Sequence, residues 1–129
     1  MADINSVITK YRREQICRVT SGGANTIAPI TKIAFGTGGV DGSGDPIPPL
    51  ETAAALNNEL ARYDVEPVAY PVSTTARYVA NIPEAEFAGA EISEAALVDG
   101  DGKLCAIKTM YVKRKDAGVT FTFTFDDEF

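Results

Sequence analysis

The first twenty residues alternate apolar and polar side chains with a helical period. Between Asn5 and Thr20, apolar residues recur every three or four positions and charged residues fill most of the gaps. Asn5 or Ser6 can cap the first turn, and Ser21-Gly22-Gly23 is a strong stop signal. The pattern therefore predicts an amphipathic helix over residues 5–20.

The rest of the chain predicts a second, shorter helix and then a series of strands. Residues 51–63 place Ala53, Leu56 and Leu60 on one helical face. After Pro67 the period changes to two, which is typical of strands. The predicted strands span residues 27–35, interrupted near Pro29, and then 65–72, 76–82, 91–98, 103–112 and 119–125.

Two turns and the final strand give the firmest structural prediction. Asp99-Gly100-Asp101-Gly102 lies between apolar runs and predicts a hairpin, and residues 114–118 predict a second turn. The last strand alternates between an apolar face and a threonine face that is solvated or packed on a neighbouring chain: Val119, Phe121, Phe123 and Phe125 against Thr120, Thr122 and Thr124. Together the elements predict a single α+β domain, rich in mainly antiparallel strands, with an N-terminal helix.

Residues 36–49 differ from the rest of the chain because glycine, proline and aspartate dominate them. Glycine permits positive φ and proline removes a backbone donor, so this segment is expected to be a loop or an extended arm. Loops of this length are usually functional or ordered by a partner. We therefore predict that this arm and the C-terminal residue contact partner proteins, through Gly38, Gly39, Val40, Asp41, Gly42, Ser43, Gly44, Asp45, Pro46 and Phe129. A variant lacking residues 38–46 is expected to fold but not to join its assembly.

Composition limits the classes of function. The 129 residues are 45% hydrophobic, enough for one domain with its own core. Twelve basic and eighteen acidic residues leave a net charge of −6, which argues against nucleic acid as a partner. The chain has no histidine, so the usual zinc ligand and the usual general base are both missing. We predict a protein that is not an enzyme and that uses no cofactor or metal.

The cysteines and the N-terminus bear on the cellular compartment. Cys17 and Cys105 have apolar neighbours and are expected to be buried free thiols. The N-terminus has no apolar signal region, and no apolar run approaches the ~20 residues of a membrane helix. Folding in a cytoplasm without membrane contact is the expectation.

Several patterns suggest a phosphate, calcium or catalytic site, and each is better explained by a structural role. Gly36-Thr37-Gly38-Gly39 lacks the lysine and the helix of a phosphate loop. Asp41 and Asp45 are spaced like the start of a calcium loop, but Thr52 stands where the terminal glutamate is required. The remaining candidates read as turn chemistry or solvated charge: Asp99 with Asp101, Glu84 with Glu86, Glu91 with Glu94, and Lys113, Arg114 and Lys115.

Three stretches, taken together, resemble the phage tail-collar fibre family, the N-terminal attachment domain of many tail fibres. The first is Thr31-Lys32-Ile33-Ala34-Phe35-Gly36-Thr37-Gly38. The second is Thr52 followed by Leu56-Asn57-Asn58-Glu59-Leu60-Ala61-Arg62, similar to the family's Leu-x-Asn-Glu-x-x-Arg segment. The third is Ile92-Ser93-Glu94-Ala95-Ala96-Leu97-Val98-Asp99 with Gly102-Lys103-Leu104 and Ala106, although Ala95-Ala96 replaces a frequent glycine.

The resemblance spans roughly residues 4–125 and implies a structural role. By this likeness the protein is a virion component of a phage tail, or of a bacteriocin-like particle with a contractile tail. It would sit at the baseplate or collar, assemble in the bacterial host cytoplasm, and contact other tail, baseplate and fibre proteins. The resemblance makes a homo-oligomer, and specifically a trimer, plausible. The fibre shaft would be a separate chain, or this chain would be a small adaptor.

A carbohydrate-binding module that contacts the host receptor is the alternative. Such modules use aromatic platforms, but the chain has no Trp and its clearest aromatic row is predicted to be buried in a strand. Binding of the isolated domain to a glycan array would favour this alternative over the adaptor.

Overall fold

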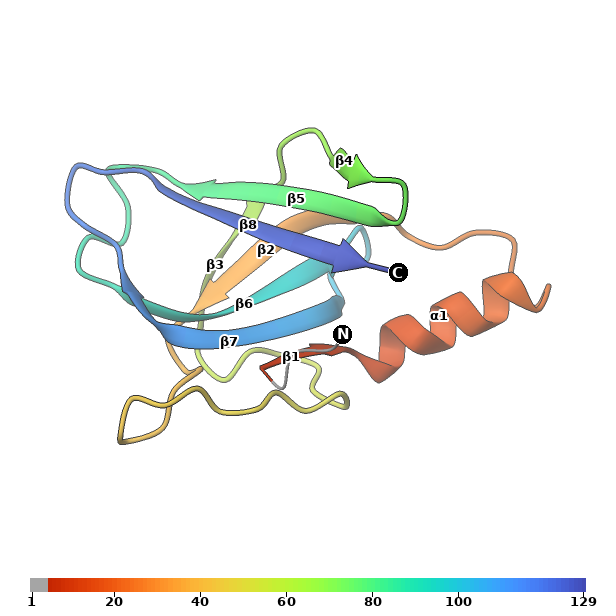
Figure 1. The fold of residues 1–129 in the computed structure, drawn as a ribbon, viewed down its shortest axis with the longest axis horizontal. Coiled ribbons are helices and arrows are strands. Elements are labelled where there is room, and N and C mark those ends of the chain that lie inside the picture. The colour runs from red at the N-terminus through yellow and green to blue at the C-terminus, as the bar shows by residue number, and fades with distance from the viewer. Residues whose placement is uncertain (1–4) are drawn as a thin grey trace.

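The computed structural model describes residues 5–129 and shows two packed antiparallel sheets with a helix beside them (Figure 1). The five-stranded sheet has the order β1-β7-β6-β2-β3, and the three-stranded sheet has the order β4-β5-β8. This arrangement confirms the predicted β-rich α+β class. The elements are β1 (Ser6–Ile8), α1 (Lys10–Thr20), β2 (Ile30–Gly36), β3 (Glu59–Asp64), β4 (Ala69–Val72), β5 (Thr75–Ile82), β6 (Glu91–Asp99), β7 (Leu104–Arg114) and β8 (Phe121–Glu128).

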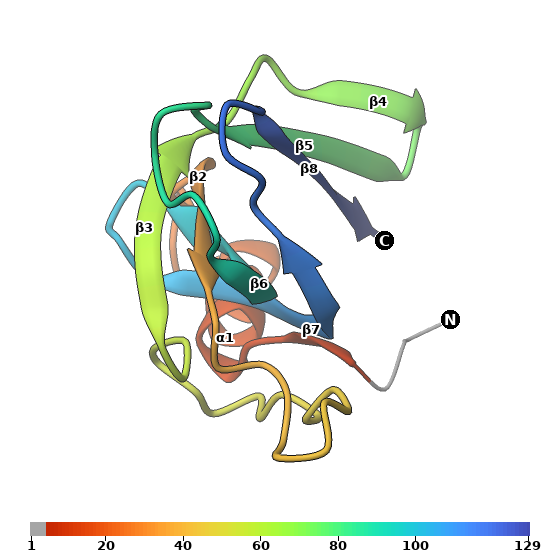
Figure 2. The ribbon, with the colours of Figure 1, turned by 90° about the vertical axis from the view of Figure 1, so that its left-hand side faces the viewer.

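The main core lies between the two sheets, which Figure 2 shows nearly edge-on. Phe35 of β2 is fully buried, and its ring meets the edges of Phe121 and Phe123 of β8 at centroid distances of 6.0 and 5.7 Å. A second apolar cluster covers the opposite face of the large sheet and includes Leu56. Because both faces are covered, β6 is buried from Ile92 to Asp99.

The predicted N-terminal helix is confirmed over Lys10–Thr20 and wrong over residues 5–9. Residues 6–8 form β1, which pairs with β7, and the helix begins only at Lys10. Thr9 is the N-cap, because its hydroxyl accepts the N–H of Arg12 and also donates to the carbonyl of Leu104. No residue of α1 is buried, and the helix points away from the sheets (Figure 1). The apolar residues of this segment therefore belong to two elements, β1 and α1, and the helix covers little of the core.

The predicted helix over residues 51–63 is wrong. Residues 59–64 form β3, which pairs with β2, and the preceding residues form turns that carry Leu56 into the second cluster. The backbone N–H groups of Asn57 and Asn58 donate to the side chain of Glu94 in β6 and are not available to a helix. Tertiary pairing here overrides a helical propensity that was weak.

The strands after Pro67 and the Asp99–Gly102 hairpin are confirmed, with shifted ends. β2 begins at Ile30 rather than residue 27, and only Ala69–Val72 of the predicted 65–72 strand pairs as β4. The hairpin joins β6 to β7, and the carboxylate of Asp99 accepts the N–H groups of Asp101 and Lys103. The turn chemistry read from the sequence thus accounts for Asp99.

The alternation in the last strand is confirmed for its phenylalanines. Phe123 and Phe125 are buried, while Thr122 and Thr124 are exposed. Val119 is 55% exposed and lies before β8, so its assignment to the apolar face is wrong. The strand instead continues to Glu128, and Asp127 occupies the next inward position.

The cysteine prediction is half right. Both thiols are free; Cys105 is buried and Cys17 is exposed on the helix. Burial raises the pKa of Cys105 to about 11. No helix within residues 5–129 is long and apolar enough to cross a membrane.

Candidate functional site: a clasped loop and an open groove

The glycine–proline loop, residues 36–49, has a fixed base and an exposed tip. Gly36 and Gly39 are buried, whereas residues 41–45 are all exposed. The tip folds on itself, because Val40 bridges to Pro46 and the carboxylate of Asp41 accepts the N–H groups of Ser43 and Asp45. Of the ten residues predicted to contact a partner, the exposed ones are residues 41–45 and Phe129. The other four are buried or half-buried at the base of the loop.

A buried carboxylate holds the base of this loop. Glu94 of β6 is 1% exposed, and its two oxygens accept the N–H groups of Gly38, Asn57 and Asn58 at 2.9, 2.9 and 2.8 Å. The neighbouring Ser93 hydroxyl accepts the N–H of Gly39 at 2.9 Å. We call this arrangement the Glu94 clasp. Because the donors come from two separate loops, the clasp ties both loops to β6. Hydrogen bonds from N–H groups to a carboxylate are stronger than bonds between neutral groups.

The glycines of the loop are required by this packing. A Cβ at Gly36 would lie 2.5 Å from a Glu94 oxygen, and one at Gly38 would lie 2.6 Å from the Cβ of Asn57. A Cβ at Gly39 would overlap the backbone carbonyl of Ser93. The phosphate-loop alternative loses its basis, because the N–H groups of Thr37, Gly38 and Gly39 already donate to Asn58, Glu94 and Ser93 and are not offered to a phosphate.

Two predictions about solvated charges are wrong, and both concern buried groups. Glu94 was paired with Glu91 as a solvated face, yet only Glu91 is exposed. Lys115 was placed in an exposed basic turn, yet it is 1% exposed, and its ammonium donates to the carbonyls of Glu84 and Asp116. The sequence signal for Glu94 was a single acidic residue inside an apolar strand. A charge buried in this way must have hydrogen-bond or ionic partners, so its position could have predicted such partners.

The remaining acidic candidates serve the fold. Glu86 accepts the hydroxyl hydrogen of Tyr63, and burial together with this bond raises the pKa of Tyr63 to about 12. Asp99 accepts the hydroxyl hydrogen of Tyr11 at 2.7 Å, which raises the pKa of Tyr11. Within residues 5–129, no three His, Cys, Asp or Glu side chains are grouped as a metal site would require.

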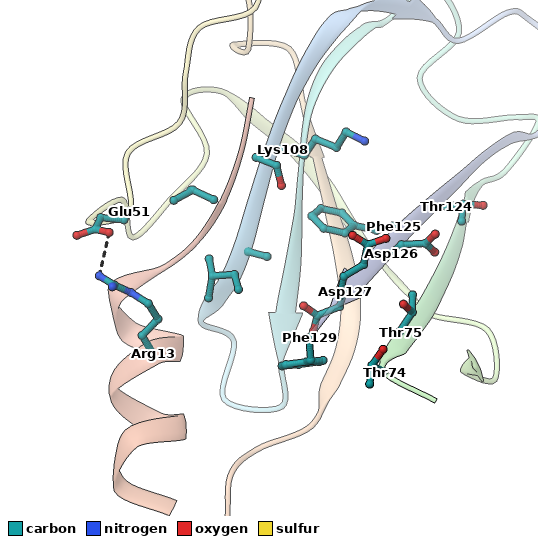
Figure 3. A pocket seen from close by; sticks show the side chains of 15 residues that line it. Arg13, Glu51, Thr74, Thr75, Lys108, Thr124, Phe125, Asp126, Asp127 and Phe129 are labelled. Carbon is teal, nitrogen blue, oxygen red and sulfur yellow. Dashed lines mark hydrogen bonds and ion pairs between the residues drawn. The ribbon is translucent and has the colours of Figure 1, made fainter. Parts of the chain in front are cut away.

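The second candidate region is a groove of about 840 Å³ between β1 and β8 (Figure 3). Its walls are the two edge strands with Phe129 at one end, and Lys108 of β7 and Phe125 of β8 lie between them. Phe129 is 69% exposed, but its N–H donates to the carbonyl of Thr74, so the C-terminus is held beside β5. The predicted contact residue Phe129 thus lies at the groove and far along the chain from the glycine–proline loop.

Acidic side chains outnumber basic ones in the groove, where Glu51, Asp126, Asp127 and Glu128 stand against Arg13 and Lys108. Asp126 is paired with Arg77, which lowers the pKa of Asp126. Asp127 is 7% exposed, and its nearest cation is Arg12 at 3.8 Å, beyond hydrogen-bond length. Burial therefore raises the pKa of Asp127 despite Arg12. The buried Nε of Arg12 also has no hydrogen-bond partner in the described part of the chain. Sequence reasoning treated residues 126–128 as an acidic tail and missed their place in β8.

Comparisons with protein-family models, with curated proteins and with solved structures found no match to this chain.

Proposed function

We propose that this protein is a structural adaptor of a phage tail or phage-tail-like particle, acting through contacts with other tail, baseplate and fibre proteins. The proposal begins from the likeness to tail-collar fibre proteins in three separate stretches of sequence. Its working surface is the exposed tip of the glycine–proline loop, residues 41–45. The observation that carries it is where those three stretches lie in the fold.

The three stretches meet at the Glu94 clasp. Gly38 belongs to the first, Asn57 and Asn58 to the second, and Glu94 to the third, and one carboxylate bonds to all of them. Residues matched in three separate stretches thus share one structural role in this fold. The convergence supports the likeness and explains why those residue types occur in that order: the clasp fixes the base from which the loop projects.

Particle composition tests the proposal. Tail particles released by the bacterium that encodes the chain are purified on a density gradient, and their proteins are quantified by mass spectrometry. The chain is expected to sediment with the particles in a fixed copy number, and a multiple of three would support a trimer. Absence of the chain from intact particles would contradict the proposal.

The tip of the loop is tested by a shortened variant. The deletion of residues 38–46 is too long for this test, because removing Gly38 and Gly39 would also break the clasp. Replacing residues 41–45 by the dipeptide Asn-Gly suits the bridge between Val40 and Pro46, since this dipeptide favours a tight hairpin turn. The variant is expected to fold normally and to be lost from particles. Gly42→Ala, which meets open space, is the matched control and should be incorporated.

The carbohydrate-binding alternative is distinguished by the same proteins. A glycan-array signal from the isolated wild-type domain that disappears in an exposed-tyrosine variant, Tyr70→Ala or Tyr111→Ala, would favour a receptor-binding role. The adaptor proposal expects no such signal.

A further inference from the structure

Within residues 5–129, the outer edge of β8 has backbone groups without a strand partner. β8 is the last strand of its sheet and pairs only with β5. The N–H of Phe129 donates to the carbonyl of Thr74, which continues the β5–β8 register. Because antiparallel partners exchange hydrogen bonds at alternate residues, the odd-numbered residues of β8 bond to β5. The N–H and C=O groups of Thr122, Thr124, Asp126 and Glu128 therefore point to the open side.

The facing edge of β1 is open in the same way. The N–H of Thr9 donates to the carbonyl of Cys105, and the N–H of Thr109 donates to the carbonyl of Asn5, so the odd-numbered residues bond to β7. Ser6 and Ile8 then direct their backbone groups away from β7, and both residues line the groove. β1 and β8 run in the same direction (Figure 1). A strand between them would be antiparallel to both.

The surface of the groove specifies the side chains of such a strand. Val7, Ala106 and Phe125 supply apolar lining, and Phe125 lies between the walls (Figure 3). The acidic groups on the β8 side are Asp126, Asp127 and Glu128, against Lys108 on β7. Asp126 is paired with Arg77, whereas Asp127 has no hydrogen-bonded cation among the described residues. Side chains directly opposite on paired strands interact, and unlike charges are favourable there.

We propose that the groove between β1 and β8 binds an extended, basic segment of a partner protein by β-strand addition. The segment pairs with the free backbone groups of both edges and joins the two sheets at this side. Its apolar side chains face Phe125, and its lysines or arginines lie opposite Glu128 and beside the Arg77–Asp126 pair. This inference goes beyond the proposed function, because it concerns how a segment is held and does not depend on the particle.

Amide hydrogen exchange of the full chain tests whether the edge is open. In the free protein, the amides of Thr122, Thr124 and Asp126 are expected to exchange at least about tenfold faster than those of Phe123, Phe125 and Asp127, because only the second set is bonded to β5. Protection of the first set in the monomer would mean that the chain fills its own groove. Protection that grows with protein concentration would mean that a second copy fills it. Either result overturns the proposal.

A peptide pair tests the occupant. The probe is a fluorescent, end-capped hexapeptide of alternating valine and lysine, and its match replaces each lysine by glutamate. Binding is followed by fluorescence anisotropy at low salt. The lysine peptide is expected to bind at least about tenfold more tightly and to slow exchange at Thr124 and Asp126. Equal affinity for both peptides, or no binding of the lysine peptide at millimolar concentration, overturns the proposal.

Variants of one residue distinguish strand pairing from simple charge attraction. Thr124→Pro removes an N–H from the open side only, a position where an edge strand tolerates proline. It should weaken binding of the lysine peptide about fivefold to tenfold, whereas Thr124→Val, which keeps the N–H, should stay within about twofold. Circular dichroism checks that both variants fold. Equal affinity of the two variants would overturn pairing along β8.

Discussion

The Glu94 clasp and the groove beside β8 treat backbone polar groups in opposite ways. At the clasp, one buried carboxylate accepts three N–H groups from two loops, and the glycines are packed too closely for any side chain. At the groove, two strand edges face each other, and every second residue of each has backbone groups with no strand partner in the described chain. A buried aspartate there lies 3.8 Å from its nearest cation.

The difference separates what builds this fold from what is available for binding. Unpaired strand edges are sites at which other chains add, and proteins keep them short or charged. The three N–H groups of the clasp are already bonded to Glu94, so changes there are expected to act through stability. Changes at the groove are expected to leave the fold intact and to act on binding or on its pH dependence.

The largest effect is expected at Glu94. Glu94→Ala removes a buried side chain and leaves three N–H groups without their acceptor, so we expect the free energy of unfolding to fall by about 3–5 kcal/mol. Glu94→Gln keeps one acceptor oxygen and should cost less. Glu91→Ala, on the exposed start of the same strand, is the control and should stay within about 0.5 kcal/mol. Urea denaturation measures all three, and equal losses for the two alanine variants would show that the clasp contributes nothing.

The next effect separates two glycines of the same loop. Gly39→Ala places a methyl group against the Ser93 carbonyl, and the strain should cost about 1–3 kcal/mol. Gly42→Ala meets nothing within 4 Å and should be neutral or slightly stabilising. Thermal unfolding of the pair measures the contrast. Similar melting temperatures would contradict a rigidly held base.

A smaller effect is expected in the tip. Asp41→Ala removes the carboxylate that accepts the N–H groups of Ser43 and Asp45, so amide exchange at these two residues should speed up. Because the tip is exposed, the free energy of unfolding should change by less than about 1 kcal/mol. Asp45→Ala is the matched control at the other end of the turn and should leave the Ser43 amide unchanged. A large loss of global stability would mean that the tip is part of the core structure.

The sequence predicted well those features that depend on local pattern. The alternation of Phe121, Phe123 and Phe125 and the Asp-Gly hairpin are set by period and by turn chemistry, and both are present in the structure. The predicted helix over residues 51–63 failed because its residues pair with β2 and bond to Glu94, contacts made across more than twenty residues of sequence. No local pattern carries such a partner.

The candidate site shows the same division. The glycine–proline loop was identified from composition, but its division into a fixed base and an exposed tip depends on Glu94, far along the chain. The groove was missed because it is formed by the two ends of the described chain, β1 and β8. The first was read as part of a helix and the second, beyond residue 125, as a tail. The period of two that places Phe123 and Phe125 inward also places Asp127 inward. This continued period was the signal that could have extended the last strand.

The smallest effects are expected at two neighbouring aspartates in the groove, and they have opposite signs. Arg77 lowers the pKa of Asp126 below its ordinary 3.8, so the folded protein binds that proton less tightly than the unfolded chain. This stabilisation is present above pH 3.8 and is lost as the pH falls through the lowered pKa. Asp126→Asn should therefore be slightly less stable than wild type at pH 7, and the difference should disappear on acidification. Exposure of the pair keeps the effect small.

Asp127 should show the reverse, because burial raises its pKa and Arg12 and Tyr78 are the titratable groups that face it. The ionised form destabilises the folded protein above the raised pKa, and the penalty shrinks as the pH falls through that pKa toward 3.8. Asp127→Asn should therefore be at least as stable as wild type at pH 7 and should lose its advantage in acid. Urea denaturation at pH 7 and pH 4 measures both variants. A lower stability of Asp127→Asn at pH 7 would show that Arg12 already compensates the burial of the ionised carboxylate, and it would leave the open edges of the groove unchanged.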